Sequence, residues 1–107
     1  MAVNLYISLP MKGVSREQIN AERERIAHLA EIKLDTFVQL ITQQSLSICE
    51  GVIGDFRNKP VYWLGDSISS MSEADYIVLG RGWENARGCR IEHAVAEEYG
   101  IKILNLE

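Results

Sequence analysis

The chain has 107 residues, 47% hydrophobic and 24% charged, an ordinary composition for one globular domain over residues 1–107. Its net charge of −4 gives the whole molecule no electrostatic basis for binding a nucleic acid polymer. Cys49 and Cys89 fit neither a disulfide framework nor a zinc spacing, and we expect no metal. Without a signal-peptide pattern or an apolar run long enough to span a bilayer, we expect a cytoplasmic protein with no membrane partner.

The first half of the chain predicts a strand, a helix and a second strand. A short apolar run over 3–9 indicates a buried strand. Ser15 and Gln18 match a capping box, which predicts a helix from there to about residue 34. β-Branched and aromatic residues over 36–41 predict the second strand. Glycines and polar residues over 42–58 favour a loop with a short helical turn near 45–50.

A second helix is predicted from Pro60 to about residue 74, because proline suits the first helical position. Its apolar residues recur at helical spacing and predict the buried face: Val61, Leu64, Ile68 and Met71. Gly65 lies inside this helix and costs about 1 kcal/mol relative to alanine. We therefore expect Gly65 to permit the close approach of another segment.

The last part predicts a strand over 76–79, a helix over 86–99 and a final strand over 101–104. Gly100 stands where a helix C-terminal glycine is expected. Strands alternate with helices, and right-handed crossovers then produce a parallel sheet covered on both faces. The fold class is α/β, a small doubly wound parallel sheet of about four strands.

Ligands of such sheets bind at the carboxyl ends of the strands, where the chain 76–104 carries a glycine-rich loop and an early helical glutamate. Gly80, Gly82 and Gly88 allow a ligand to approach the backbone closely. Glu92 lies about one turn into the helix. The helix dipole alone explains a carboxylate there, but the same dipole would also support a nucleophilic glutamate.

Other polar groups are predicted at the same edge. Tyr6, in the first strand, needs a partner for its hydroxyl, either a backbone acceptor or a carboxylate from a neighbouring element. The loop from Ser8 to Gly13 is either a plain strand-to-helix turn or a place that receives an anion. Asp66, at the border of its helix's apolar face, is either solvated or a second carboxylate facing Glu92.

A cysteine-dependent site is a further alternative, because Cys89 and His93 are four residues apart on one helix. No third residue that would orient the pair is evident, and small buried cysteines are common. Three arginines near the crevice could hold a phosphate or a carboxylate, or pair with Glu84 and Asp55: Arg81, Arg87 and Arg90.

These motifs resemble the nucleoside 2-deoxyribosyltransferase-like superfamily, most closely its short bacterial and phage branch. The resemblance rests on the opening Tyr6-Ile-Ser-Leu-Pro-Met-Lys-Gly13, on Asp66 with the later Ala74-Asp75, and on Gly82-Trp-Glu-Asn-Ala-Arg-Gly88. It rests also on the spacing of Gly88, Glu92 and Ala96. The resemblance covers both ends and most of the chain in order.

The resemblance implies a flavodoxin-like fold and cleavage of an N-glycosidic bond. It implies that Glu92 attacks the anomeric carbon and forms a glycosyl ester, that Tyr6 positions Glu92, and that Asp66 assists the departing base. The sugar then passes to another base or to water. The residues expected to bind substrate lie in the loops at this edge: Ser8, Lys12, Gly13, Gly82, Trp83, Arg87 and Gly88.

The expected ligand is a nucleoside or nucleoside 5′-monophosphate, no cofactor is expected, and the resemblance implies a homo-oligomer. Two other functions stay open. One is a nucleotide- or signal-binding module that has the fold without catalysis, and the other is a glycohydrolase acting on NAD. Base release by the protein, and its dependence on Glu92, would discriminate between them.

Overall fold

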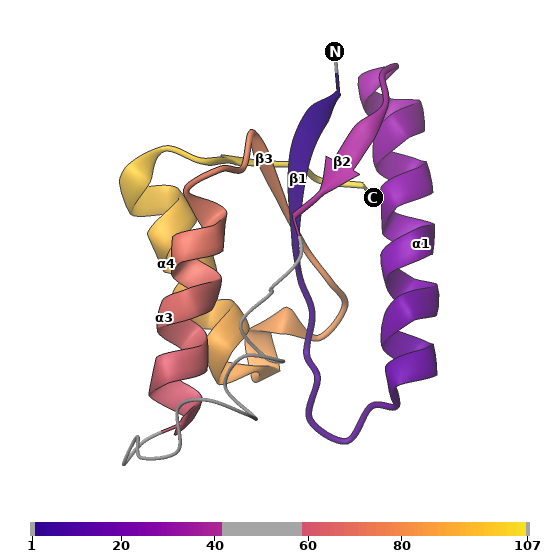
Figure 1. The fold of residues 1–107 in the computed structure, drawn as a ribbon. Helices are drawn as coiled ribbons and strands as arrows, with labels where there is room; N and C mark the ends of the chain where they lie inside the picture. Colours follow the sequence, from indigo (N-terminus) through magenta and orange to yellow (C-terminus); the bar gives the residue numbers. More distant parts are fainter. Residues whose placement is uncertain (1, 42–58, 107) are drawn as a thin grey trace, which may run out of the picture.

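The computed structural model describes residues 2–41 and 59–106. Over these residues the chain is an α/β fold in which helices cover both faces of a parallel sheet (Figure 1). The elements in chain order are β1 (Val3–Ser8), α1 (Arg16–Leu34), β2 (Val38–Leu40), α3 (Lys59–Met71), β3 (Tyr76–Leu79), the short 3-10 helix η1 (Trp83–Asn85), α4 (Arg87–Tyr99) and β4 (Lys102–Ile103). The predicted loop and helical turn over 42–58, together with Cys49 and Asp55, lie outside the described residues.

The sheet has four parallel strands in the order β2-β1-β3-β4, a small flavodoxin-like arrangement that confirms the predicted fold class. The chain runs outward from β1 to β2 and then crosses back to β3, so its direction along the sheet reverses between β1 and β3. Tyr6 lies beside Ile77 and Ser8 beside Leu79 in this central pair. A crevice is therefore expected outside the carboxyl ends of β1 and β3.

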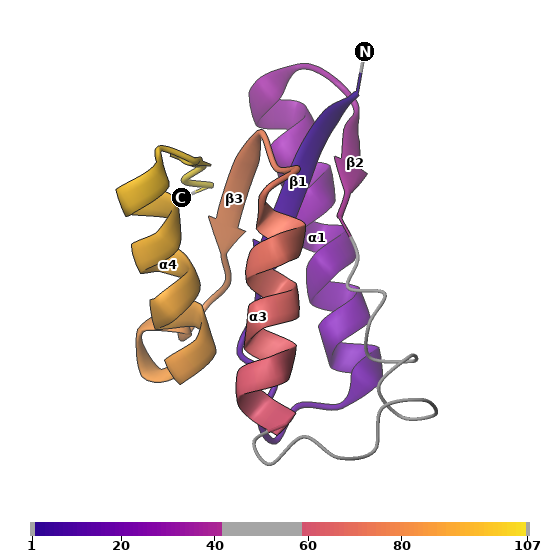
Figure 2. The same cartoon turned by 60° about the vertical axis from the view of Figure 1, so that its left-hand side comes forward.

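The two faces of the sheet have different helices. α1 packs on one face, and α3 and α4 lie together on the other (Figures 1 and 2). Because successive strand residues point to opposite faces, Leu5 and Ile7 join the core under α1, while Tyr6 faces Met71 and Ala96. None of the described helices is both long and apolar enough to cross a membrane.

Local signals determine where several elements begin and end. The capping box is present, with Ser15 Oγ accepting from the Gln18 N–H and Gln18 Oε1 accepting from the Ser15 N–H, both at 3.1 Å. Asp35 ends α1 in a left-handed conformation. Gly100 ends α4 at a φ of 75°, as its position predicts, and the chain then turns into β4.

The expected buried face of α3 is confirmed only in part. Met71 is buried as predicted and Leu64 and Ile68 are half-buried, but Val61 is 61% exposed and Ser67 is buried instead. Val61 lies in the first turn of α3, whereas Met71, in the last turn, packs with Ile77 and Ala96 in the core. A Cβ atom added at Gly65 would meet none of the described residues within 4 Å, so the close approach expected at this glycine is not found among them. Gly80 does serve a close approach, because a Cβ atom there would lie 2.2 Å from Leu9 Cδ2.

Candidate active site

A large cavity lies at the carboxyl end of β1, between α3 and the first turns of α4, and has a volume of about 900 Å³. This is the edge of the sheet where a doubly wound fold binds its ligands. Its described lining comes from five places: the end of β1 and the loop after it (residues 6–12), Arg23 of α1, Ile41 after β2, one side of α3 (Pro60, Trp63, Leu64, Ser67), and residues 82 and 85–92.

Glu92 is the only carboxylate among the described lining residues, and only 6% of it is exposed. The Tyr6 hydroxyl donates to Glu92 Oε2 at 2.6 Å, and the Ser8 hydroxyl donates to Oε1 at 2.5 Å. Such short distances are typical of hydroxyl groups bonded to an ionised carboxylate. The sequence left the partner of the Tyr6 hydroxyl open between a backbone acceptor and a carboxylate; the structure shows a carboxylate.

Tyr6 and Ser8 reach the same carboxylate because they are two residues apart on β1 and so point to the same face of the sheet. β1 is a central strand, held by β2 on one side and by β3 on the other. Both hydroxyl groups therefore belong to a rigid part of the fold, while Glu92 belongs to α4. Ser8 was expected to bind substrate. Its contact with Glu92 was missed, although the Tyr-x-Ser alternation contained the signal for it.

The cavity is rich in cations. Lys12, Arg23, Arg87 and Arg90 line it, and in the described part of the chain no Lys or Arg nitrogen lies within 4 Å of the Glu92 carboxylate. Arg90 donates to the backbone oxygen of Glu84 at 2.9 Å. Lys12 and Arg87 stand where the sequence predicts them. Arg23 was missed, since it comes from the polar surface of α1 and nothing in its neighbourhood marks it.

Cys89 and His93 do not form a catalytic pair. Cys89 is buried in the lining of the larger cavity, whereas His93 lines the smaller one. Burial raises the pKa of the Cys89 thiol, outweighing a hydrogen bond with Ser8 that lowers it, and the nearby Glu92 raises it further. His93 instead stacks on Trp83, with 4.4 Å between ring centroids, and its Nδ1 lies 3.3 Å from Glu97. A neutral thiol apart from any base is a poor nucleophile.

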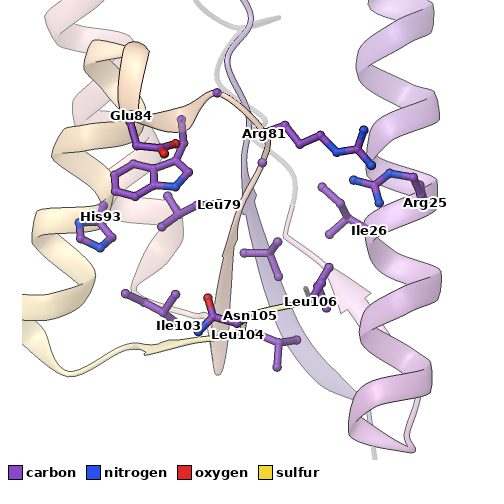
Figure 3. Close-up of a pocket in the computed structure, with 14 residues that line it drawn as sticks. Arg25, Ile26, Leu79, Arg81, Glu84, His93, Ile103, Leu104, Asn105 and Leu106 are labelled. Atoms are coloured by element: carbon purple, nitrogen blue, oxygen red, sulfur yellow. The ribbon is translucent and has the colours of Figure 1, made fainter.

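The smaller cavity, of about 430 Å³, extends from α1 past the ends of β3 and β4 to α4 (Figure 3), and Arg81 and Trp83 are among its lining residues. In this view Arg81 and Arg25 extend toward each other, while Glu84 and His93 lie on the opposite side of the cavity. Trp83 was expected in the crevice with Glu92, but it lines this cavity instead, whereas Asn85 at the other end of the same short helix lines the larger one. Gly82 itself lines both cavities.

Two other expected residues lie outside the lining of the larger cavity. Gly13, at a φ of 75°, shapes the turn before α1. Asp66 is half-buried, and the side of α3 that faces the cavity presents Trp63 and Ser67 instead. The role of Asp66 with the departing base stays a prediction. Gly88, at the start of α4, does line the cavity. Over the described residues there is no cluster of His, Cys, Asp and Glu that could hold a metal ion.

Comparison with known proteins identifies the family. A family model described as a domain of unknown function, DUF4406, matches residues 3–105. The chain belongs to this family. The match runs from β1 to the end of β4, so Tyr6, Ser8 and Glu92 all belong to the DUF4406 domain. Comparisons with curated proteins and with solved structures found no match.

Proposed function

We propose that this DUF4406 protein cleaves the N-glycosidic bond of a (deoxy)nucleoside or a nucleoside 5′-monophosphate, with Glu92 as the nucleophile. The observation that carries the proposal is the Glu92 carboxylate, buried at the switch point of the sheet and held by Tyr6 and Ser8 in a cavity of substrate size. The resemblance of the Tyr6, Gly88 and Glu92 motifs to the nucleoside 2-deoxyribosyltransferase-like superfamily supports the same reaction.

Glu92 suits attack on a sugar because its partners are hydroxyl groups rather than cations. A carboxylate paired with Arg or Lys would have its charge compensated before the substrate arrives. In the proposed step an oxygen of Glu92 forms a bond to the anomeric carbon as the bond from that carbon to the base nitrogen breaks. The base leaves with the electron pair of that bond and takes up a proton. Negative charge beside the anomeric carbon stabilises the oxocarbenium character of the transition state.

The resulting glycosyl ester is resolved by water, which gives the free sugar, or by a second base, which gives a new nucleoside. In either case the Glu92 carboxylate is regenerated. The side chain that protonates the base is, by the resemblance, Asp66, which would have to act from the edge of the cavity.

The cations of the cavity favour a substrate with a phosphate group. Lys12, Arg87 and Arg23 line the same space as Glu92, and guanidinium groups bind phosphate oxygens in pairs. These charges also offset the repulsion between Glu92 and an anionic substrate. A nucleoside 5′-monophosphate therefore fits the cavity better than the uncharged nucleoside.

A binding module without turnover is the second candidate, and the position of Asp66 favours it. Glu92 is the only acidic side chain of the described cavity lining, so no second acid stands ready there to protonate a leaving base. The same cations and the same cavity would then retain a nucleotide intact.

Base release separates the two candidates. The protein is incubated with deoxynucleosides, ribonucleosides, their 5′-monophosphates and NAD, and free base is followed by chromatography. We expect release from a monophosphate, and a loss of at least about ten-thousand-fold in Glu92→Gln, because the nucleophile is gone. Glu98→Gln is the matched control, an exposed glutamate on the same helix.

Intact mass measurement on a slow substrate should show the glycosyl adduct on the wild-type chain and none on Glu92→Gln. Release that persists in Glu92→Gln would remove the nucleophile assignment. A nucleotide that raises the melting temperature without any release would establish the binding module instead.

A further inference from the structure

Ser8 occupies a buried position at the end of β1, 2% exposed, and its hydroxyl donates to Glu92 Oε1. We propose that Ser8 is a second positioning residue for Glu92, which holds one carboxylate oxygen while Tyr6 holds the other. The inference rests on the proposed function, in which Glu92 attacks the substrate. It reassigns Ser8, which the sequence suggested as part of a phosphate-binding loop.

The geometry of the two bonds explains why both are needed. A carboxylate held through one oxygen can still turn about its bond to Cγ, and this rotation moves the other oxygen. Donors on Oε1 and Oε2 together fix the plane of the group. Because Tyr6 and Ser8 lie on one strand of the sheet, their separation cannot change without disturbing β1. Attack on a carbon atom requires this fixed direction of approach.

Ser8 has too few hydrogen-bond donors to hold Glu92 and a phosphate group at the same time. A serine hydroxyl has one proton to donate, and in this structure that proton goes to Glu92 Oε1. What remains on Ser8 Oγ is acceptor capacity, which a phosphate dianion cannot use. The side chains of Lys12, Arg23 and Arg87 line the same cavity and have donors suited to a phosphate.

Cys89 is the other side chain beside Ser8 that could compete for its proton. A thiolate at this position would attract the Ser8 hydroxyl away from Glu92. Burial instead raises the pKa of the thiol and keeps it neutral. The stronger acceptor next to Ser8 is therefore the carboxylate.

Steady-state kinetics of Ser8→Ala on a nucleoside 5′-monophosphate tests the assignment. We expect kcat to fall by about 10- to 100-fold, the range for residues that orient a reacting group, while KM changes by less than about threefold. Ser8→Thr keeps the hydroxyl and should recover a large part of kcat. Ser70→Ala is the control, since among the described residues its hydroxyl bonds to the backbone oxygen of Asp66 in the same helix and it lies outside the described cavity lining. A rise in KM for the monophosphate with kcat unchanged would make Ser8 a phosphate ligand and overturn the proposal.

A second measurement does not need turnover. Buried hydroxyl protons in short bonds to a carboxylate exchange slowly and resonate downfield in proton NMR spectra. We expect one such resonance to disappear in Ser8→Ala and another in Tyr6→Phe. If Ser8→Ala leaves both resonances in place, Ser8 does not hold Glu92, whatever the protein catalyses. If the resonances respond as expected but the wild-type protein releases no base from any substrate, the paired hydroxyl contacts stand and the proposed function fails.

Discussion

The two faces of β1 carry side chains of different chemistry, apolar on one face and polar on the other, although the same six residues form both. Toward α1, Leu5 and Ile7 pack among apolar side chains such as Ile26 and Val78. Toward α3 and α4, Tyr6 and Ser8 donate hydrogen bonds to a buried carboxylate. Alternation along one strand thus separates the residues that stabilise the fold from those that form the site. The polar face is kept rigid by the apolar face behind it.

The largest expected effect on stability comes from a substitution on the apolar face of β1. Leu5 is fully buried under α1, so Leu5→Ala should lower the free energy of unfolding by about 2 to 5 kcal/mol, from lost burial and the cavity left behind. Urea unfolding measures it. Activity per folded molecule should stay near wild type, because Leu5 points away from Glu92. Leu5→Met, which keeps the volume, should cost less than about 1.5 kcal/mol.

Tyr6, on the other face of the strand, should show the reverse pattern: a large loss of activity and a small loss of stability. Tyr6→Phe keeps the ring and removes the hydroxyl that holds Glu92 Oε2, so base release should fall by about 10- to 100-fold. The free energy of unfolding should fall by no more than about 1 to 3 kcal/mol, the usual cost of a buried acceptor without its donor. A Tyr6→Phe protein that turns over at the wild-type rate would contradict a difference between the faces.

A pair of glycine substitutions tests how tightly the chain packs just after β3, where Gly80 lies against Leu9. A methyl group at Gly80 would collide with Leu9, and Gly80→Ala should therefore destabilise the protein by about 1 to 3 kcal/mol. Gly65→Ala is the matched control in α3, where the methyl group meets none of the described residues. It should stabilise the protein by about 0.4 to 1 kcal/mol, since alanine restricts the unfolded chain. Thermal unfolding gives both values, and equal signs would refute the packing described for Gly80.

The smallest effect concerns the buried thiol on the polar face. Burial raises the pKa of Cys89 above its ordinary value of 9.0, so the unfolded chain loses this proton at a lower pH than the folded one. The stability contributed by the neutral thiol is complete below pH 9.0 and is lost as the pH rises through the folded-state pKa. Unfolding free energies measured from pH 7 to about 10.5 should decline more steeply for wild type than for Cys89→Ala. Parallel curves would show that the thiol titrates alike in both states.

Much of the fold could be predicted because its signals are local. The capping box of Ser15 and Gln18, the glycine at position 100 and the apolar run over 76–79 each act within a few residues, and the structure confirms them. The α/β class follows from the alternation of such segments. Local signals also placed Glu92 early in the last helix, at the edge of the sheet where ligands bind.

Only the tertiary structure decided which side chains meet. In α3, Ser67 lines the cavity and the neighbouring Asp66 does not, which depends on how the whole helix packs. Trp83 lines the smaller cavity, although it is near Glu92 in sequence. Ser8 and Glu92 are 84 residues apart, and no periodicity in the chain encodes a bond over that distance. The sequence by itself determined the elements and the edge of the sheet where the site lies. Packing decided the partners of Glu92, because a hydrogen bond depends on distances that only the assembled sheet sets.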